Sequence, residues 1–324
     1  MTATVLLILG IVFLVVGADF LVRGASNLAA MARISPLVIG LTVVAFGTSA
    51  PELAVSLHAS FTSQADLAVG NVVGSNICNV LLILGASALV APLVVAQQLV
   101  RLDVPIMIGV SGLVFFFGID GSIGTSDGVV LFVGGVSYTL FLLFQSRREE
   151  NPEVQDEYAQ EYGPREFSWA KVSVELLAFV GGMICLVLGS QLLVKGAVTI
   201  AEAMEINPLI IGLTIVALGT SLPELATSIV ARLRGERDIA VGNVVGSNIF
   251  NILVVLGATS ALSPGGIVID PSVLAFDIPV MIGVAVICFP ICLNDNLVSR
   301  WEGGMLLVYY LAYTLYLVMK TTEH

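Results

Sequence analysis

Two acidic residues stand inside long apolar runs of the chain. Glu52 lies in the run that begins at Pro36, and Glu224 lies in the run that begins at Pro208. A charged side chain at the centre of a bilayer costs about 2.5–3.5 kcal/mol or more, so residues of this kind usually serve a function. No lysine or arginine lies at matching depth in these runs, which disfavours a structural ion pair. We therefore interpret both carboxylates as functional groups.

Hydroxyl groups and a proline accompany each glutamate. Thr48 lies four residues before Glu52 and shares its helix face. Pro51 cannot donate a hydrogen bond to the carbonyl four residues earlier, so we expect the helix to kink or break and to leave carbonyls free. Free carbonyls at membrane depth need a protein partner or a hydrated cavity, although the hydroxyls could also bond back to the helix. The candidate donors in the two copies are Ala45, Thr48 and Ser49, and Ala217, Thr220 and Ser221.

The apolar segment after each glutamate carries a polar stripe with a four-residue spacing. The stripes are Asn71, Ser75 and Asn79, and Asn243, Ser247 and Asn251. Every candidate ligand bears oxygen, which favours Na⁺, Ca²⁺ or Mg²⁺ over zinc or copper. Hydrogen bonding between helices is the alternative role, and for Asn71 and Asn243 the two roles stay equally open. Asn76 and Asn248 lie about 100° off the stripes, and we expect them to support packing.

These features belong to an internal duplication. The stretch 36–85 recurs at 208–257 with a constant offset of 172 residues, no gap and about 32 identical positions in 50. A repeat of this length is typical of a duplicated half-molecule rather than of a solenoid. We predict two repeats, 1–145 and 171–324, joined by an acidic linker at 146–170.

The composition is that of a membrane protein. Of the 324 residues, 57% are hydrophobic and 11% are charged, against about half and a quarter in soluble chains. The apolar runs are about 20 residues long, which is enough to cross a bilayer as a helix. We predict an all-α integral membrane protein in which helices 2, 3, 7 and 8 are broken and form an ion site at the midplane. The ten predicted spans are 4–30, 36–62, 67–90, 100–119, 126–145, 172–201, 208–233, 239–262, 272–293 and 300–320.

Five spans in each half imply that the halves have opposite orientations, because five is odd. With the N-terminus outside and the linker in the cytoplasm, nearly all basic residues fall in inner loops, as the positive-inside rule requires. Inverted repeats with a site near the midplane are a transporter architecture. We place the protein in the cell membrane, with Arg23 and Lys195 near the ends of their spans reaching the surface. The inner basic residues are Arg33, Arg101, Arg147, Arg148, Arg165, Lys171, Arg232, Arg234, Arg237 and Arg300.

Other chemistries find little support in the sequence. All four cysteines lie in apolar segments, where cysteine packs as a small hydrophobe. Two histidines are too few for a His-rich zinc site. The net charge of −11 argues against nucleic acid as a partner.

The duplicated motifs resemble a known family. Gly47-Thr-Ser-Ala-Pro-Glu52 with Gly70-Asn-Val-Val-Gly-Ser-Asn76, and their second copies, are similar to the two α-repeats of the Ca²⁺/cation antiporter superfamily. The similarity covers all ten spans and is greatest to prokaryotic sodium/calcium exchangers. It implies that Glu52 and Glu224 bind the exchanged ions directly. It also implies that the site is completed by Ala45, Thr48, Ser49, Ser75, Asn79, Ala217, Thr220, Ser221, Ser247 and Asn251.

The resemblance implies a secondary active antiporter that exchanges Na⁺ for Ca²⁺ by alternating access, with electrogenic extrusion of Ca²⁺. The first and sixth spans would be its sliding gates. The potassium-dependent branch has an acid where this chain has Asn251, which argues against K⁺ co-transport. The expected partners are the two ions and the lipid bilayer, with no cofactor, no obligatory protein partner and no enzymatic reaction. Three alternatives stay open: a proton-coupled antiporter of Ca²⁺ or another divalent cation, an intramembrane hydrolase using the paired glutamates, and a passive channel.

Overall fold

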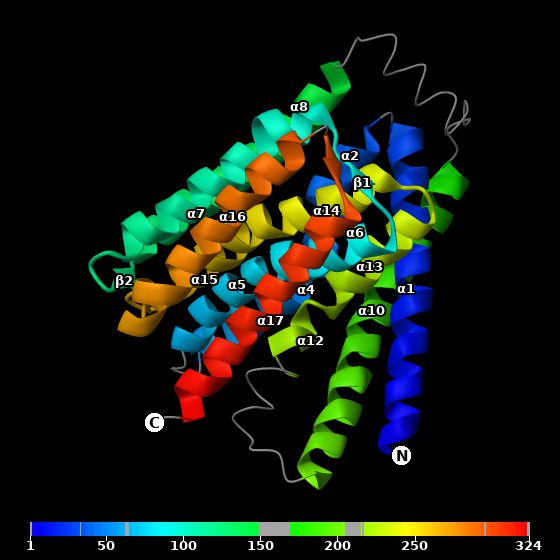
Figure 1. Ribbon diagram of the computed structural model, residues 1–324. Helices are drawn as coiled ribbons and strands as arrows, with labels where there is room; N and C mark the ends of the chain where they lie inside the picture. Colours follow the sequence, from blue (N-terminus) through cyan, green and yellow to red (C-terminus); the bar gives the residue numbers. More distant parts are fainter. Residues whose placement is uncertain are drawn as a thin grey trace.

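The computed structural model is a bundle of long apolar helices (Figure 1). It describes residues 2–32, 34–61, 65–148, 169–204, 215, 217–294 and 296–322. In this part of the chain, eight helices are long and apolar enough to cross a membrane, and a bent helix pair gives a ninth crossing. They match the predicted spans except for 208–233, whose first half lies largely outside the described residues. The predicted helical membrane fold is confirmed.

Where the structure describes both halves, they have the same order of elements. The symbol η marks a π-helical segment. The first half contains α1 (Ala3–Ala32), α2 (Pro36–Ile39), η1 (Gly40–Val44), α3 (Ala45–Thr48), α4 (Ala50–Phe61), α5 (Ala65–Cys78), η2 (Asn79–Leu84), α6 (Gly85–Val90), β1 (Leu93–Val94), η3 (Leu99–Asp103), α7 (Val104–Gly118), β2 (Ser122–Ile123) and α8 (Thr125–Arg148). The second half contains α10 (Trp169–Ala203), α12 (Ala217–Thr220), α13 (Leu222–Leu233), α14 (Arg237–Phe250), η5 (Asn251–Leu256), α15 (Gly257–Leu262), β3 (Ile267–Val268), η6 (Val273–Asp277), α16 (Ile278–Leu293), β4 (Leu297–Val298) and α17 (Arg300–Thr322).

The second span breaks where glycine and proline predict it. Ser49, between α3 and α4, has φ −84° and ψ 4°, and the two parts of the span meet at 44°. Ser221, between α12 and α13, has nearly the same conformation, with φ −89° and ψ 3°. The Ser49 N–H donates to the Ala45 carbonyl at 3.0 Å, whereas the Ser221 N–H donates to the Leu218 carbonyl at 3.1 Å. The Ala45 carbonyl is therefore engaged, contrary to the expectation that it is free.

The third and eighth spans widen instead of breaking. A π-helical segment begins at Asn79 and another at Asn251. The helix continues on both sides, so that 67–90 is one helix of 24 residues. Segments of π-helix are rare and occur frequently at functional sites. The breaks expected in these two spans are thus replaced by a local change of helical pitch, which begins at the asparagine predicted to be a ligand.

Helices α1 and α10 form a close pair along one side of the bundle (Figure 1). Gly17 lies against Gly182, and Gly10 lies against Gly189, so the two helices run antiparallel. A Cβ atom on Gly182 would lie 2.6 Å from the Leu21 backbone nitrogen, and only small residues allow so close an approach. Antiparallel contact between the first helices of the two halves is what inverted repeats require. The contact glycines recur every seven residues, at Gly10, Gly17 and Gly24, and at Gly182, Gly189 and Gly196.

Two short strand pairs join the halves at opposite ends of the bundle (Figure 1). Strand β1 pairs antiparallel with β4, and β2 pairs antiparallel with β3. Six predicted crossings separate β1 from β4, and four separate β2 from β3. Since paired strands must lie on one side of the membrane, an even number of crossings is required in each case. Both counts are even only if the seventh predicted span, 208–233, crosses the membrane. The strand pairs therefore support that span and the prediction of ten spans in two inverted halves.

Some predictions concern residues that the structure does not describe. Of the linker 146–170, only 146–148 and 169–170 lie within the described residues. Arg33 and Arg165, which were counted among the inner basic residues, lie outside them as well. The division into repeats 1–145 and 171–324 and their orientation in the membrane stay predictions.

Candidate cation site

The two glutamates lie buried where the halves meet. Glu52 is in the first turn of α4 and Glu224 is in the first turn of α13, directly after the two breaks. Both residues are 0% exposed, and the carboxylates are close enough to interact electrostatically. Helix α14 packs against η1 and α3, while α5 contacts α12 and η2 contacts α13. The break in each half therefore faces the polar stripe of the other half.

Three of the four carboxylate oxygens in this interface have no partner. Ser49 Oγ donates to Glu224 Oε1 at 3.2 Å. Glu224 Oε2 and both carboxylate oxygens of Glu52 are buried without a hydrogen bond. The ion pairs found among the described residues both involve Asp19, and neither reaches a glutamate. Burial of an unpaired charge is costly, and a bound cation would offset that cost.

Hydroxyl groups from both halves meet beside the carboxylates. Thr48 Oγ1 and Ser247 Oγ lie 3.5 Å apart, and Ser221 Oγ donates to Ser75 Oγ at 3.4 Å. Both contacts cross between the halves. Thr220 Oγ1 is buried and has no hydrogen-bond partner. The structure thus brings these five residues to the interface with the glutamates, and their role as ion ligands stays a prediction.

The first asparagine of each polar stripe holds the turn that carries the glutamate. Asn71 Nδ2 donates to the Glu52 backbone carbonyl at 3.2 Å and to Ser56 Oγ at 3.0 Å. Asn243 makes the same contacts in the second half, to the carbonyl of its glutamate at 3.3 Å and to a serine hydroxyl at 3.0 Å. Its Oδ1 also accepts a hydrogen bond from Thr48 at 3.1 Å. Of the two roles left open by the sequence, these contacts favour hydrogen bonding between helices.

Four asparagines form a network across the interface. Asn79 Nδ2 donates to Asn248 Oδ1 at 3.0 Å, and Asn251 Nδ2 donates to Asn76 Oδ1 at 3.2 Å. Asn79 Oδ1 and Asn251 Oδ1 are buried and unpaired. The sequence predicts only packing support for Asn76 and Asn248, whereas the structure connects them directly to two candidate ligands. The available signal in the sequence was their unchanged recurrence beside the stripes.

The unpaired atoms define the chemistry of the site. Glu52, Glu224, Asn79 and Asn251 all present buried oxygen acceptors without a partner. Carboxylate and carboxamide oxygens are ligands of hard cations such as Ca²⁺. Among the described residues, no group of three or more His, Cys, Asp or Glu could hold a metal ion. Two carboxylates would therefore need neutral oxygens to complete the coordination of a cation.

A cavity of about 180 Å³ lies beside the two helix breaks. Pro51 and Val55 of α4, Gln191 of α10 and Thr220 of α12 contribute to its lining. Thr220 directly precedes the break in the seventh span, and Pro51 directly precedes Glu52. The cavity therefore lies next to residues that precede the two glutamates in the chain, while neither glutamate lines it.

One ion pair, between Asp19 and Arg234, joins α1 to the end of α13 farther along the bundle. Asp19 accepts a hydrogen bond from Arg234 Nε at 2.6 Å and pairs with Arg23 at 3.3 Å. In the antiparallel register of α1 and α10, Asp19 lies about 10–20 Å along the helix axis from the α10 residues that line the cavity. Arg23, which was expected to reach the surface, does so with 57% of its side chain exposed while it is paired with Asp19.

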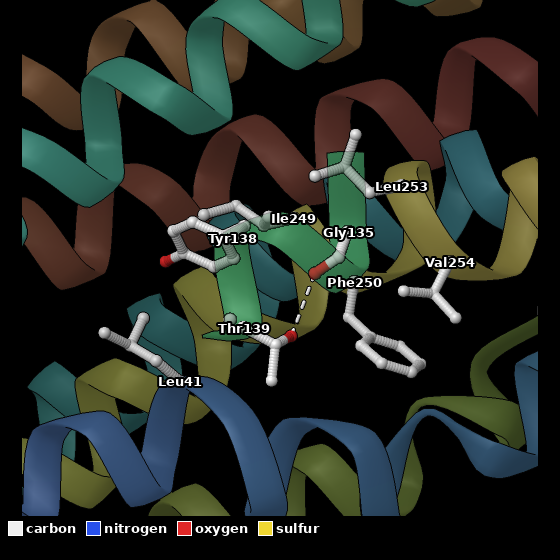
Figure 2. A pocket seen from close by; sticks show the side chains of 9 residues that line it. Leu41, Gly135, Tyr138, Thr139, Ile249, Phe250, Leu253 and Val254 are labelled. Carbon is white, nitrogen blue, oxygen red and sulfur yellow. Dashed lines mark hydrogen bonds between the residues drawn. The ribbon is translucent and has the colours of Figure 1, made fainter. Parts of the chain in front are cut away.

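A second, small pocket lies elsewhere (Figure 2). It has a volume of about 10 Å³ and is lined mainly by apolar residues of α8, α14 and η5. The Thr139 hydroxyl donates to the Gly135 carbonyl at 2.9 Å, and the Tyr138 hydroxyl donates to Asp103 at 2.8 Å. Since both hydroxyls in its lining are engaged, this pocket offers little to a cation.

A membrane protein made of two duplicated halves, with paired carboxylates buried at their interface, has the features of a secondary cation transporter. The chain belongs to the sodium/calcium exchanger family. The sequence profile described as "Sodium/calcium exchanger protein" matches residues 2–146 and 174–319. The family transports Na⁺ and Ca²⁺, so the protein is a transporter and not an enzyme, as predicted.

Relatives match over nearly the whole chain. The putative antiporter CaxA of Alkalimonas amylolytica is 42% identical, with 97% of this chain and 98% of CaxA covered. The inner membrane protein YrbG of Escherichia coli is 41% identical, with 90% and 89% covered. The solved structure of the sodium-calcium exchanger NCX_Mj superposes with a TM-score of 0.81 at 30% identity and covers 96% of this chain and 97% of its own. The general part of the functional prediction is confirmed: the protein is a multi-pass membrane antiporter of cations including Ca²⁺.

Proposed function

We propose that the protein exchanges Na⁺ for Ca²⁺ by alternating access at the site around Glu52 and Glu224. The observation that carries this proposal is the set of buried, unpaired oxygens on these glutamates and on Asn79 and Asn251. The description of the related NCX_Mj structure as a sodium-calcium exchanger supports Na⁺ as the coupling ion.

The charge of the site suggests how exchange is coupled. Two carboxylates neutralise one Ca²⁺ or two Na⁺, and neutral oxygens help to hold a third Na⁺. Both kinds of ion require Glu52 and Glu224, so they compete and do not occupy the site together. If the halves reorient only with the site filled, exchange is obligatory. More than two Na⁺ for each Ca²⁺ makes the cycle electrogenic and lets the Na⁺ gradient drive Ca²⁺ out of the cell.

Two neutral side chains in the proposed site support transport that does not depend on K⁺. Asn79 and Asn251 are carboxamides, so the site has two formal negative charges and no third acid. By the family resemblance, the potassium-dependent exchangers place an acid at the second of these positions. We therefore infer that K⁺ is not carried.

The coupling ion is tested by flux in liposomes that contain the purified protein. We expect ⁴⁵Ca²⁺ uptake to follow an imposed Na⁺ gradient, to be stimulated by a membrane potential of the appropriate sign, and to be unchanged when K⁺ is replaced by choline. Uptake that follows a pH gradient and ignores Na⁺ would instead identify a proton-coupled antiporter. Ca²⁺ flux that needs no counter-ion would indicate a channel.

The asymmetry between the two sides of the site supports alternating access. The cavity opens beside Thr220, one turn before Glu224. On the other side, one turn after Glu224, Thr227 is 0% exposed, and Asp19 and Arg234 tie α1 to the end of α13. We interpret this arrangement as a conformation in which access to the site lies on the side of Thr220, while the two glutamates themselves stay covered.

Substitution of Asp19 by asparagine tests this interpretation. Loss of the carboxylate weakens the ion pair with Arg234, and we expect the closed side to open more often. A cysteine at Thr227, in a background without the native cysteines, should then react several-fold faster with a water-soluble thiol reagent. Glu202→Gln, at an exposed site in α10, should leave that rate unchanged. Equal labelling in Asp19→Asn and the parent would contradict a closing role for the ion pair.

The basic residues support one orientation in the membrane. We place the N-terminus outside and the linker in the cytoplasm, since this puts Arg101, Arg234 and Arg300 in inner loops. In this orientation the cavity faces outward, because Gln191 lies in the outer half of α10. The name of YrbG supports the inner membrane as the location.

A further inference from the structure

Two of the four asparagines at the interface, Asn76 and Asn248, bond to each other reciprocally, and each accepts from one of the other two. Asn76 Nδ2 donates to the Asn248 backbone carbonyl at 3.2 Å, and Asn248 Nδ2 donates to the Asn76 backbone carbonyl at 3.3 Å. Their side-chain oxygens accept from Asn251 and Asn79. Both polar atoms of Asn76 and of Asn248 are thus engaged with the opposite half. All four residues are at most 2% exposed.

This network fixes which end of each ligand carboxamide faces the site. Asn79 donates its amide to Asn248 Oδ1, so its own oxygen points elsewhere and is left unpaired. A rotation of the carboxamide by 180° would set two oxygen acceptors against each other. Asn251 is held by Asn76 in the same way. In a buried site such a mismatch is costly, because a lost hydrogen bond is not replaced by water.

We propose that Asn76 and Asn248 are positioning residues that determine the cation affinity and selectivity of the site. They hold the carboxamides of Asn79 and Asn251 with oxygen toward the cation and nitrogen away from it. The inference rests on the proposed cation site and adds two residues that do not themselves touch the ion. It also explains why polar side chains recur about 100° off the two stripes.

The effect should be larger for Ca²⁺ than for Na⁺. A divalent ion interacts more strongly with each oriented dipole, and Ca²⁺ takes six to eight oxygen ligands. A carboxamide that is free to rotate presents its N–H groups to the cation for part of the time. This weakens the binding of Ca²⁺ more than the binding of Na⁺. Asn76 and Asn248 therefore act on selectivity and not only on stability.

Asn248→Leu tests the proposal, because leucine has a similar shape and no hydrogen-bonding atom. We expect the dissociation constant for ⁴⁵Ca²⁺, measured on purified protein without any gradient, to rise about fivefold to tenfold, as for the loss of one hydrogen bond between neutral groups. The number of binding sites should be unchanged, and the Na⁺ concentration that displaces Ca²⁺ should fall. Thr259→Val is the matched control, since it removes a buried hydrogen bond of 2.6 Å to Val255 away from the network and should leave Ca²⁺ affinity unchanged.

A second variant separates orientation from charge. In the parent, Asn79→Asp sets a carboxylate against Asn248 Oδ1, and we expect it to weaken Ca²⁺ binding. With Asn248→Leu already present, the same change should cost less, so that the two effects are not additive. If Asn248→Leu does not fold, the same measurements on Asn76→Leu with Asn251→Asp decide the question in the other half.

The outcomes for the two proposals are distinct. Parent protein that does not bind Ca²⁺ would refute the proposed function itself. Parent protein that binds Ca²⁺, together with an Asn248→Leu variant of equal affinity and selectivity, would overturn only the positioning role. A fall in the number of sites at constant affinity would likewise show that Asn248 contributes to folding and not to orientation.

Discussion

Glu52→Gln and Glu224→Gln should each abolish Ca²⁺ exchange. Each substitution removes one of the two negative charges in a site where the described residues supply no third acid. Loss of one member of a buried, compensated charge pair costs about 3 kcal/mol or more, which corresponds to roughly a hundredfold weaker binding or worse. The measurement is ⁴⁵Ca²⁺ uptake in Na⁺-loaded liposomes, with ⁴⁵Ca²⁺ binding to the purified protein alongside it.

The same variants should not be less stable than the parent when no ion is bound. Both oxygens of Glu52 lack a hydrogen bond, so a neutral glutamine removes an unpaired buried charge. We expect the melting temperature of ion-free Glu52→Gln to equal or exceed that of the parent, whereas the rise in melting temperature that Ca²⁺ produces by binding the folded state should disappear.

Glu202→Gln is the control for a carboxylate outside the site. It lies exposed in α10, and its transport and Ca²⁺-induced stabilisation should match the parent. Normal exchange in Glu52→Gln would show that the unpaired carboxylate is not a ligand, and the proposed mechanism would then fail.

Gly182→Ala should disrupt the contact between α1 and α10. The added Cβ would lie 2.6 Å from the Leu21 backbone nitrogen and 2.7 Å from the Gly17 carbonyl oxygen. Backbone atoms cannot rotate away as a side chain can, so the helices must separate. Overpacking of this kind costs about 1–3 kcal/mol. If α1 and α10 are the moving elements of the exchanger, their separation should also lower the transport rate by at least about tenfold.

The neighbouring glycine provides a matched control. A Cβ on Gly181 meets no atom within 4 Å, and alanine in a helix interior is about 0.5–1 kcal/mol more favourable than glycine. Gly181→Ala should therefore keep full transport and melt at the same or a slightly higher temperature. The two measurements are the melting temperature in detergent and the initial rate of Na⁺-driven Ca²⁺ uptake. Equal behaviour of the two alanine variants would contradict the close packing of these helices.

Local sequence features predicted the elements of the fold well. The spans follow from runs of apolar residues, since the length of a membrane helix is set by bilayer thickness. The break at Ser49 follows from Gly47 and Pro51, because a proline inside a helix removes a hydrogen bond whatever surrounds it. The duplication of 36–85 at 208–257 is a property of the sequence alone, and the structure repeats it element by element from α12 onward.

Helical periodicity was a weaker guide to side-chain contacts. A stripe with four-residue spacing assumes a regular α-helix, but the helix changes to π geometry at Asn79 and again at Asn251. The pattern also treats all members of a stripe alike, whereas Asn71 binds the backbone of Glu52 and Asn79 keeps a free oxygen. Which role each asparagine takes depends on the neighbour that it meets.

The sequence by itself determined that two acids are buried in a duplicated membrane protein and that oxygen ligands accompany them, because residue type and spacing within one segment suffice for that. Only the tertiary structure decided which oxygens remain unpaired, how Asn76 and Asn248 hold Asn79 and Asn251, and that a cavity lies beside the two helix breaks. The physical reason is that these properties arise between the halves. Their partners lie about 170 residues apart in the chain, and nothing in the local pattern of either half specifies how the two surfaces meet.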